Sequence, residues 1–226
     1  MTASSVPVQP IPPATSLRTQ VETALSAAIV AGEMPPGELF SAPALAARFN
    51  VSATPVREAM LNLEKRGFVQ AVRNKGFRVT AVSEADLTDI VGVRLLLEPP
   101  AMRELAARYP RDRAAELRSM AERIVAGSDA GDLPGYLRTD TEFHLALTAL
   151  LGNRRLVLVV ADLRAQTRLV GLAGLLGTDV LHASSMEHLD LLAALERGDG
   201  EAAEQLMRRH IEHVRGWWAG REEPPG

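Results

Sequence analysis

The sequence contains no cysteine, and this absence excludes disulfide bonds and thiolate metal ligands from its 226 residues. It also fits a reducing compartment, so we expect the protein in the cytoplasm. Aromatic residues make up only 4% of the chain although 46% of it is hydrophobic. The cores must therefore be built mainly from Leu, Ala and Val, a composition that favours helices over sheets.

The first 16 residues, MTASSVPVQPIPPATS, contain no Lys or Arg and no long apolar run. They therefore resemble neither a signal peptide nor a membrane-spanning helix, and we expect no association with a membrane. Four prolines in this short stretch disfavour regular structure. The sequence thus predicts a disordered arm at residues 1–15.

Charge is spread unevenly along a chain whose net charge is −3. Residues 41–80 contain seven Lys or Arg and two Glu, a local balance of +5. Residues 81–226 contain 17 basic and 23 acidic side chains, a balance of −6. A basic block beside an acidic remainder favours an anionic partner for the first part. A solvated charged surface gives the same counts, so charge alone leaves both interpretations open.

The first part of the chain has the pattern of three helices followed by a hairpin. Ser16 and Ser41 are suitable helix N-caps, and Thr54 before Pro55 predicts the start of a third helix. The segments FVQAV and FRVTAV then alternate apolar and polar residues on either side of the turn RNKG. This alternation predicts a two-stranded wing after the helices.

After Val82 every segment has helical periodicity. The segments open on Ser, Asp, Asn or Thr, which are N-cap residues, and most end near Gly. Pro99 and Pro100 are expected to kink or restart the first of these helices, because proline has no backbone N–H to donate. The fold expected is therefore mostly α, with a bundle of about six helices after the N-terminal block.

The segment ALAARFNVSATPVREAMLNLEKRGFVQAVRNKGFRVT resembles the winged helix-turn-helix of the GntR family of bacterial transcription regulators. The family usually has Arg between Ser52 and Thr54, where this sequence has Ala53. The resemblance implies a DNA-binding domain over residues 16–82. The matching residues are Leu45-Ala46, Val51-Ser52, Thr54-Pro55-Val56-Arg57-Glu58-Ala59, Leu63-Glu64, Gly67 and the wing glycine Gly76.

A helix that enters the major groove needs short polar side chains at its start and a long hydrogen-bond donor just behind them. Ser52 and Thr54 can contact phosphates, and Arg57 just behind them can bind guanine. On the wing, Arg73 and Lys75 can reach the DNA backbone or the minor groove. The apolar residues of the same helix, Val56, Met60 and Leu63, are expected to face the core. The predicted DNA-binding residues are Ser52, Thr54, Arg57, Arg73, Lys75 and Gly76.

Asp140 and His144 lie four residues apart in an otherwise apolar segment, LRTDTEFHLALTAL. Four residues advance a helix by about 400°, so both side chains lie on one face. His188 and His210 also lie on helices with an apolar side. A lone histidine on such a face is usually an ordinary core residue. One carboxylate and three imidazoles that converge inside a bundle form a site for a divalent transition metal.

The spacing of these residues resembles the FCD ligand-binding domain, which follows the GntR winged helix in the FadR subfamily. The resemblance covers roughly residues 83–218 and also includes Asn153, Glu187 and Gly198-Asp199, and it predicts a domain over residues 83–220. It implies that the metal ligands are Asp140, His144, His188 and His210. Imidazole and carboxylate without thiolate suit Zn²⁺ first, with Ni²⁺ or Mn²⁺ as alternatives. The remaining histidines are His182, which points elsewhere, and His213, which lies near the face of His210.

Arg94 matches the Arg of the first FCD helix, although the Glu that often stands two residues before it is Gly92 here. The resemblance implies that Arg94 binds the carboxylate of an effector. A buried ion pair with Glu98, four residues on, is the alternative. Arg138 and Arg164 are further candidates for effector binding. Four protein ligands leave one or two metal positions free, which a small carboxylate could fill.

These features together predict a transcription regulator rather than an enzyme. It would bind a palindromic operator as a homodimer, and a small organic acid bound at the metal would control that binding. The helices before Pro99 and after Arg111 are expected to supply the dimer contact. One alternative makes the metal itself the signal. Another is a metal-dependent hydrolase, against which we find no obvious general base beside the ligands.

Overall fold

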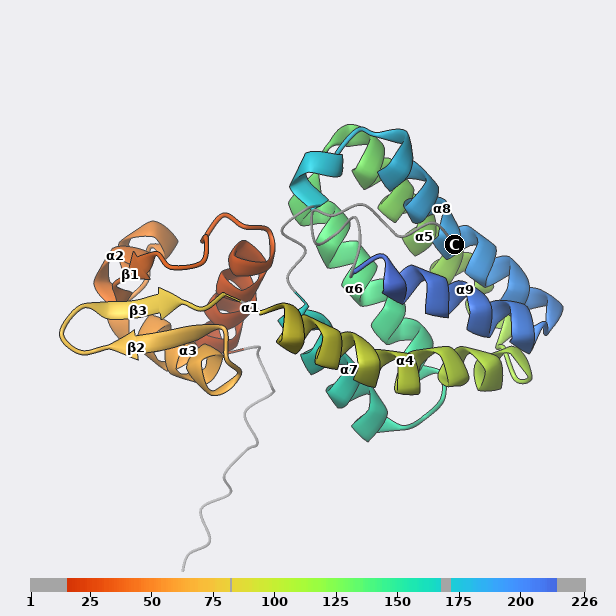
Figure 1. The fold of residues 1–226 in the computed structure, drawn as a ribbon, viewed down its shortest axis with the longest axis horizontal. Helices are drawn as coiled ribbons and strands as arrows, with labels where there is room; N and C mark the ends of the chain where they lie inside the picture. The colour runs from red at the N-terminus through yellow and green to blue at the C-terminus, as the bar shows by residue number, and fades with distance from the viewer. Residues whose placement is uncertain (1–15, 82, 168–171, 215–226) are drawn as a thin grey trace, which may run out of the picture.

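The structure is a computed structural model that describes residues 16–81, 83–167 and 172–214. The arm predicted at residues 1–15 lies outside the described residues. The chain forms two lobes joined through the segment before α4, with helix α1 at the boundary between them (Figure 1). None of the helices in the described ranges is both long and apolar enough to cross a membrane.

The N-terminal lobe has three helices and a small sheet. Its elements are α1 (Leu17–Val30), β1 (Leu39–Phe40), α2 (Ala42–Phe49), α3 (Ala53–Lys65), β2 (Val69–Val72) and β3 (Gly76–Val79). The strands pair antiparallel in the order β1-β3-β2, with Phe40 and Ala71 both opposite Phe77. The wing was expected to have two strands. The third, β1, is two residues long and therefore too short to show alternation in the sequence.

The capping prediction succeeds for two of the three helices in this lobe. The Ser16 and Ser41 hydroxyls accept hydrogen bonds from the backbone N–H groups of the first turns of α1 and α2. The prediction that Thr54 caps α3 is wrong, because Ser52 is the N-cap and the helix begins at Ala53. Pro55 is still tolerated there, since the first-turn N–H groups have no partners within the helix.

The core of the N-terminal lobe lies between α1 and α3. Val56, Met60 and Leu63 are fully buried, as the sequence predicted. They pack with the buried stripe of α1, which is formed by Val21, Leu25 and Ile29. This core fixes one side of α1 and leaves its opposite side directed away from the lobe.

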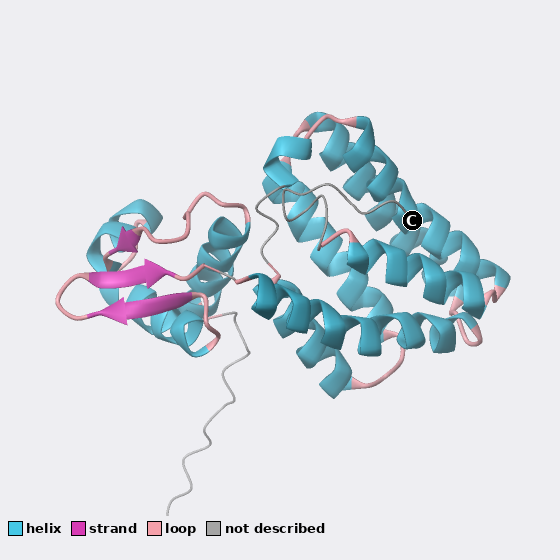
Figure 2. Ribbon diagram, in the orientation of Figure 1, coloured by secondary structure: helices cyan, strands magenta, loops and turns pink. Residues whose placement is uncertain are grey.

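The described part of the C-terminal lobe is helical, and the six α-helices in it confirm the predicted bundle. They are α4 (Glu84–Ala106), α5 (Ala114–Ala130), α6 (Leu133–Ala149), α7 (Arg154–Gln166), α8 (Asp179–Arg197) and α9 (Gly200–Glu212), with short 3-10 turns at Arg111–Arg113 and Leu172–Leu175. Figure 2 shows no strand in the described part of this lobe. The predicted caps Ser83 and Asn153 are present.

Helix α4 continues through Pro99 and Pro100, so the expected restart does not occur. Two prolines remove two backbone donors from the helix. The helix is held by packing instead, because α4 runs along α9 and also contacts α6, α7 and α8. Pro99 itself is buried in this packing. Tertiary contacts thus override the local preference of the sequence.

Direct contacts join the two lobes beside α1. Helix α1 packs against α6 and α7. Arg66, which caps the C-terminus of α3, donates from Nε to Asp162 of α7 at 2.9 Å and from Nη1 to Glu22 of α1 at 3.3 Å. The C-terminal end of α3 is therefore tied to the helical lobe.

Candidate functional site

Three helices of the C-terminal lobe bring one carboxylate and three imidazoles together. Asp140 and His144 come from α6, His188 from α8 and His210 from α9. All four side chains are buried, and one possible ligand atom from each lies within 4.8 Å of the others. The structure thus gathers the four residues that the sequence selected from three separate segments.

Neighbouring contacts direct the Nε2 atoms of two rings toward the centre of this group. The Nδ1 atom of His188 lies 2.9 Å from the carbonyl oxygen of Ser185. The Nδ1 atom of His210 lies 3.0 Å from a carboxylate oxygen of Glu187. A histidine held through Nδ1 in this way presents Nε2 as a metal ligand.

The spacing of the facing atoms fits a metal ion. The His188 Nε2 atom lies 3.2 Å from His144 Nε2 and 3.1 Å from Asp140 Oδ1. The Asp140 Oδ1 atom lies 3.5 Å from His144 Nε2 and 4.0 Å from His210 Nε2. Ligands about 2.1 Å from a common ion are separated by roughly 3–4 Å. The donor set also suits a divalent transition metal, so these residues can hold one.

Phe143 closes one side of the group. Its ring packs edge-on against His144 and His188, with centroid separations of 5.4 and 5.2 Å. Phe143 itself is fully buried. Such packing limits the rotation of both imidazoles and so helps to keep their ligand atoms in place.

Glu187 contacts two histidines, His210 and His213. One of its oxygens accepts from Arg209 Nε at 2.8 Å, and the carboxylate also lies 3.0 Å from His210 Nδ1 and 3.2 Å from His213 Nε2. Glu187 therefore orients His210 from behind. The neighbouring positions Glu187 and His188 point in different directions on α8, which the spacing alone could not assign. Glu142 is exposed, in keeping with a solvated group.

The two remaining histidines lie outside the group of four. His182 is largely exposed, and its Nδ1 atom lies 2.8 Å from Asp129. His213 is buried but contacts Glu187. Its position three residues from His210 places it behind that ligand.

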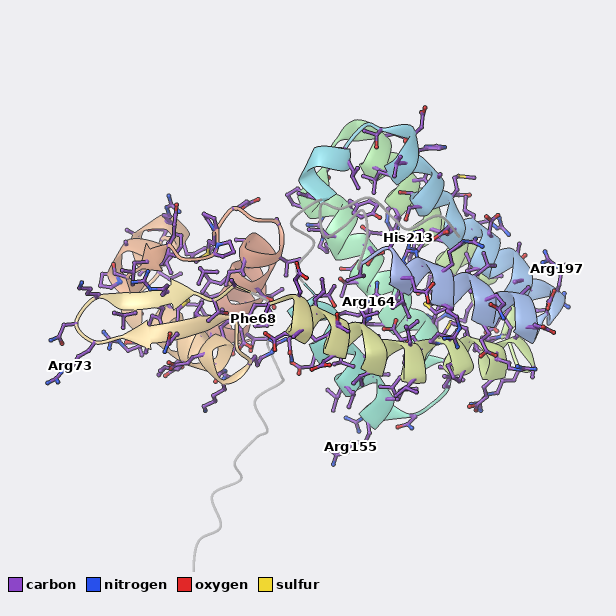
Figure 3. The ribbon with its side chains drawn as sticks, in the orientation of Figure 1. Phe68, Arg73, Arg155, Arg164, Arg197 and His213 are labelled. Carbon is purple, nitrogen blue, oxygen red and sulfur yellow. The ribbon has the colours of Figure 1, made fainter. Side chains whose placement is uncertain are left out.

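A buried chain of ion pairs leads away from Asp140. Arg164 donates to Asp140 at 2.7 Å and to Glu98 at 2.9 Å. Glu98 in turn accepts from Arg94 at 2.6 Å, which is the ion pair that the sequence offered as the alternative role of Arg94. Figure 3 shows Arg164 inside the helical lobe. The four charges compensate one another, which is the condition for burying them.

Burial lowers the pKa values of His144 and His210, whereas neighbouring charges lower the pKa of Asp140 against the effect of its burial. Burial alone would raise the pKa of Asp140, but the guanidinium of Arg164 and the imidazoles hold this pKa well below its usual value. Burial lowers the pKa of His144, with a further contribution from Arg164. Burial likewise lowers the pKa of His210 to about 4, although Glu187 acts in the other direction. An ionised carboxylate beside neutral imidazoles is the form that binds metal.

These pKa values change the expected pH range of metal binding. From ordinary histidine values, metal affinity would fall as the pH drops through roughly 6.5. In the folded protein His144 and His210 stay neutral to lower pH, because burial disfavours their charged forms. Protons therefore compete with the metal in the folded state only nearer pH 4 for His210.

A cavity of about 900 Å³ adjoins the group of four. Asp140, Arg164 and Arg94 line its inner end, and the exposed Arg138 also lines it. The three arginines that the sequence proposed for effector binding thus border one space. Of these, Arg94 and Arg164 are already paired with carboxylates, whereas Arg138 is at the surface.

The predicted DNA-binding side chains are exposed on the N-terminal lobe. Ser52, Thr54 and Arg57 lie at the start of α3, and all three are exposed. Arg73 and Lys75 lie in the turn between β2 and β3, also exposed. Figure 3 places Arg73 at the tip of the wing, on the side away from the helical lobe.

Gly76 has a structural role in this wing. Its φ is +122°, a conformation that side chains rarely adopt, and a Cβ atom there would collide with the backbone oxygen of Phe40. Glycine therefore lets β3 approach β1. Asn74, with φ of 59°, supplies the other left-handed residue of the turn.

Both lobes match known families. The bacterial regulatory protein family gntR matches residues 17–79, and the FCD domain family matches residues 89–213. The chain is 30% identical over 184 residues to the Nta operon transcriptional regulator of Aminobacter aminovorans, covering 79% of this chain and 85% of that protein. It is 25% identical to the HTH-type transcriptional repressor RspR of Escherichia coli K12, over 92% of this chain and 89% of the repressor.

A solved structure with the same arrangement is E. coli McbR/YncC. It superimposes with a TM-score of 0.78 at 25% sequence identity, covering 88% of this chain and 95% of that one. Both relatives, the Nta operon regulator and RspR, are transcription regulators rather than enzymes. The two matches in one chain, the winged helix followed by the FCD domain, show that this protein is a DNA-binding transcription regulator of the GntR family, in its FadR subfamily.

Proposed function

We propose that this regulator binds a palindromic operator as a homodimer and that a carboxylate effector, bound at a metal in the helical lobe, controls operator binding. Residues 16–82 would bind DNA, and residues 83–220 would bind the metal, the effector and the second copy. The observation that supports this most directly is Asp140, which belongs both to the metal-binding group and to the lining of the adjoining cavity. A ligand in that cavity can therefore act on the metal site.

The DNA contacts would come from α3 and the wing. Arg57 makes no ion pair with any residue in the described ranges, so its guanidinium is available to bind a guanine edge in the major groove. The short side chains of Ser52 and Thr54 would contact phosphates beside it. Arg73 and Lys75 on the exposed wing would add contacts to the DNA backbone or minor groove. Bacterial operators lie in the cytoplasm, which is where the protein would act.

The metal would be held by Asp140, His144, His188 and His210. We propose Zn²⁺ as the ion, with Ni²⁺ and Mn²⁺ as alternatives, because three imidazoles and one carboxylate suit these borderline ions. When bound, the ion would offer a positively charged position for an anionic ligand. The residues of this chain would fix its place, with Glu187 holding His210 and Arg164 holding Asp140.

The charge balance favours an anionic effector. Arg94 and Arg164 carry two positive charges, and Glu98 and Asp140 carry two negative charges, so the buried chain is neutral. The imidazoles of His144 and His210 are neutral at pH 7, given their lowered pKa values. A divalent ion therefore adds positive charge that these buried side chains do not compensate. A carboxylate would compensate part of it.

The homodimer contact would use α4 and α7. Exposed apolar side chains gather on these two neighbouring helices, namely Val93 and Leu96 on α4 and Leu158 and Val159 on α7. Helix α4 was also expected from the sequence to supply the dimer contact. Helix α5, the other helix expected from the sequence, has none of the large exposed apolar side chains in the described ranges, so α7 replaces it in the proposal.

Operator binding measured with separate control of metal and carboxylate tests this function. The operator is first selected from random DNA with the full-length protein, and its dissociation constant is then measured for metal-free and Zn²⁺-loaded protein. A panel of small carboxylates should change that constant only when Zn²⁺ is present. If Zn²⁺ alone produces the whole change, the metal is the signal, and the carboxylate proposal is wrong.

A further inference from the structure

The cavity of about 900 Å³ lies between the two lobes and not within one of them. Its lining comes from α1 of the DNA-binding lobe and from α4, α6 and α7 of the helical lobe. Figure 1 shows α1 facing the helical lobe across this boundary. A ligand that filled the cavity would therefore touch both lobes at once.

The wall contributed by α1 is made of small side chains. Val21, Leu25 and Ile29 point into the core of the DNA-binding lobe. The other side of the helix lines the cavity with Ala24, Ala27, Ala28 and Ala31, among polar neighbours. Larger side chains there would fill the space between the lobes, whereas alanines leave it open and present methyl groups to it.

The inner end of the cavity is polar and is lined by two arginines and one carboxylate, Arg94, Arg164 and Asp140. Arg94 lines it and is only 2% exposed. Its Nε and Nη2 atoms donate to Glu98, at 2.6 and 3.4 Å. Its Nη1 atom makes no hydrogen bond to any residue that the structure describes, so this buried guanidinium has a donor left over. A guanidinium donor without a protein acceptor favours an anionic acceptor brought by a ligand.

The size of the cavity indicates more than a small acid. Cavities of roughly 300–1,000 Å³ enclose molecules of drug size, so acetate would leave most of this one empty. We propose that the cavity binds an amphipathic carboxylic acid, with its carboxylate at the Arg94 and Asp140 end and its apolar chain along the alanine face of α1. The inference rests on the proposed function and adds the ligand class and the contact with the DNA-binding lobe.

This contact gives the ligand a direct means of regulation. Arg66 and Glu22, which form the ion pair between α3 and α1, also line the cavity. Arg66 extends the link to Asp162 on α7. A ligand that packs against α1 interacts differently with each arrangement of the two lobes, and it thereby changes the affinity for DNA.

Chain-length dependence of binding tests the proposal. Full-length Zn²⁺-loaded protein is titrated calorimetrically with acetate, butanoate, hexanoate and octanoate. Affinity should rise roughly fourfold for each methylene that enters the cavity, since each contributes about 0.8 kcal/mol. One acid should bind per chain.

A substitution that fills the cavity from the α1 side tests whether the apolar chain of the acid binds there. Ala27→Phe changes an exposed position of α1, away from the buried stripe, and leaves every charged group of the inner end intact. This variant should abolish the increase in binding affinity from acetate to octanoate, while its metal content and its affinity for acetate stay as in the wild type. Ala115→Phe, at an exposed position of α5 outside the cavity lining, is the matched control and should keep the gain.

The outcomes separate this inference from the proposed function. Equal affinity for acetate and octanoate, or a length dependence that survives in Ala27→Phe, overturns the cavity proposal and leaves a small-acid effector at the metal. Failure of every acid to bind the Zn²⁺-loaded protein overturns the carboxylate effector itself and with it the cavity ligand. A length dependence lost in Ala27→Phe and kept in Ala115→Phe supports the proposal.

Discussion

Among single residues, two buried carboxylates of the helical lobe are each shared between several partners. Asp140 is shared between Arg164 and the imidazoles, and Glu187 is shared between Arg209, His210 and His213. Removing one member would leave another buried without its partner, which costs more than the contact itself contributes. The effect of a substitution on stability or metal affinity here therefore depends on which buried partners lose their contacts.

His144→Ala should remove most of the bound metal, because it deletes one of four ligands whose atoms lie within 4.8 Å of one another. His182→Ala should keep the metal, since His182 is exposed and lies beside Asp129 instead. Elemental analysis of the purified wild type and both variants measures this. Equal metal content in the wild type and His144→Ala would contradict the assignment of the site.

Glu187→Gln should lower metal affinity by about 10- to 100-fold, the usual effect of losing a carboxylate that orients a histidine ligand. Glu142→Gln, at an exposed position of α6, is the control and should have no effect. Competition with a chelator of known affinity gives the two dissociation constants. Unchanged affinity in Glu187→Gln would mean that Glu187 supports only the packing of α8 against α9.

At the level of whole elements, we propose that α3 and the wing make different kinds of contact with DNA. The start of α3 presents Arg57 beside two short polar residues, an arrangement that suits base recognition. The turn between β2 and β3 presents Arg73 and Lys75, whose flexible charges suit phosphates. Sequence preference and overall affinity should therefore respond to different substitutions.

Arg57→Ala should lose about 1–3 kcal/mol of discrimination at one guanine in each half-site. Lys75→Ala should instead weaken binding to all sequences alike and reduce the salt dependence of the binding constant by about one counterion per contact. Binding to the operator and to single-base variants, at several salt concentrations, separates the two effects. The assignment of α3 as the recognition helix is wrong if Arg57→Ala keeps the operator preference intact.

In the molecule as a whole, two lobes with separate cores are joined beside one helix and one arginine. The two cores have no fully buried residue in common, although the partly buried Val30 packs against both of them. The helical lobe also exposes apolar side chains on α4 and α7 that no described element covers. In the proposed function, control of DNA binding and assembly would thus both depend on surfaces outside the two cores.

Leu96→Glu should weaken the dimer, because Leu96 is 76% exposed on the proposed contact face of α4 and a charge would be buried there on assembly. Met186→Glu, at a residue of α8 that is 37% exposed, is the control and should leave assembly unchanged. Light scattering at micromolar concentration reports the mass of each variant. A wild type that is monomeric under these conditions and binds its operator as one copy would contradict the proposal.

The metal-free protein should become less stable as the pH falls from about 6.5 to about 4. In this range the unfolded chain protonates His210, whereas the folded protein does not, because burial lowers the pKa of His210 to about 4. Stability falls with pH wherever the unfolded state binds more protons. The loss in the free energy of unfolding should be on the order of a few kcal/mol, because a tenfold change in proton affinity between the two states corresponds to roughly 1.4 kcal/mol.

Urea unfolding of metal-free protein at several pH values measures this dependence. His210→Gln should have a shallower dependence, because glutamine does not titrate. Equal pH dependence in the wild type and His210→Gln would show that His210 is not the group responsible.

The order of the elements and the chemistry of the site could be predicted from local patterns in the amino-acid sequence. Ser16, Ser41 and Ser83 indicated helix starts, because capping is decided by a few neighbouring residues. The Asp140 and His144 pair indicated a ligand face, because four residues nearly complete a helical turn. The family motifs indicated both domains, and the matches to the gntR and FCD families confirm them.

How distant segments of the chain pack together could be determined only from the tertiary structure. The length of α4 through Pro99 and Pro100, the position of β1 beside β3 and the place of Glu187 behind His210 all depend on packing between elements. The ion pairs of Arg164 with Glu98 and Asp140 and the cavity against α1 depend on it as well. Local patterns carry no information about contacts across long stretches of chain, because those contacts are fixed by the burial of side chains from several elements at once.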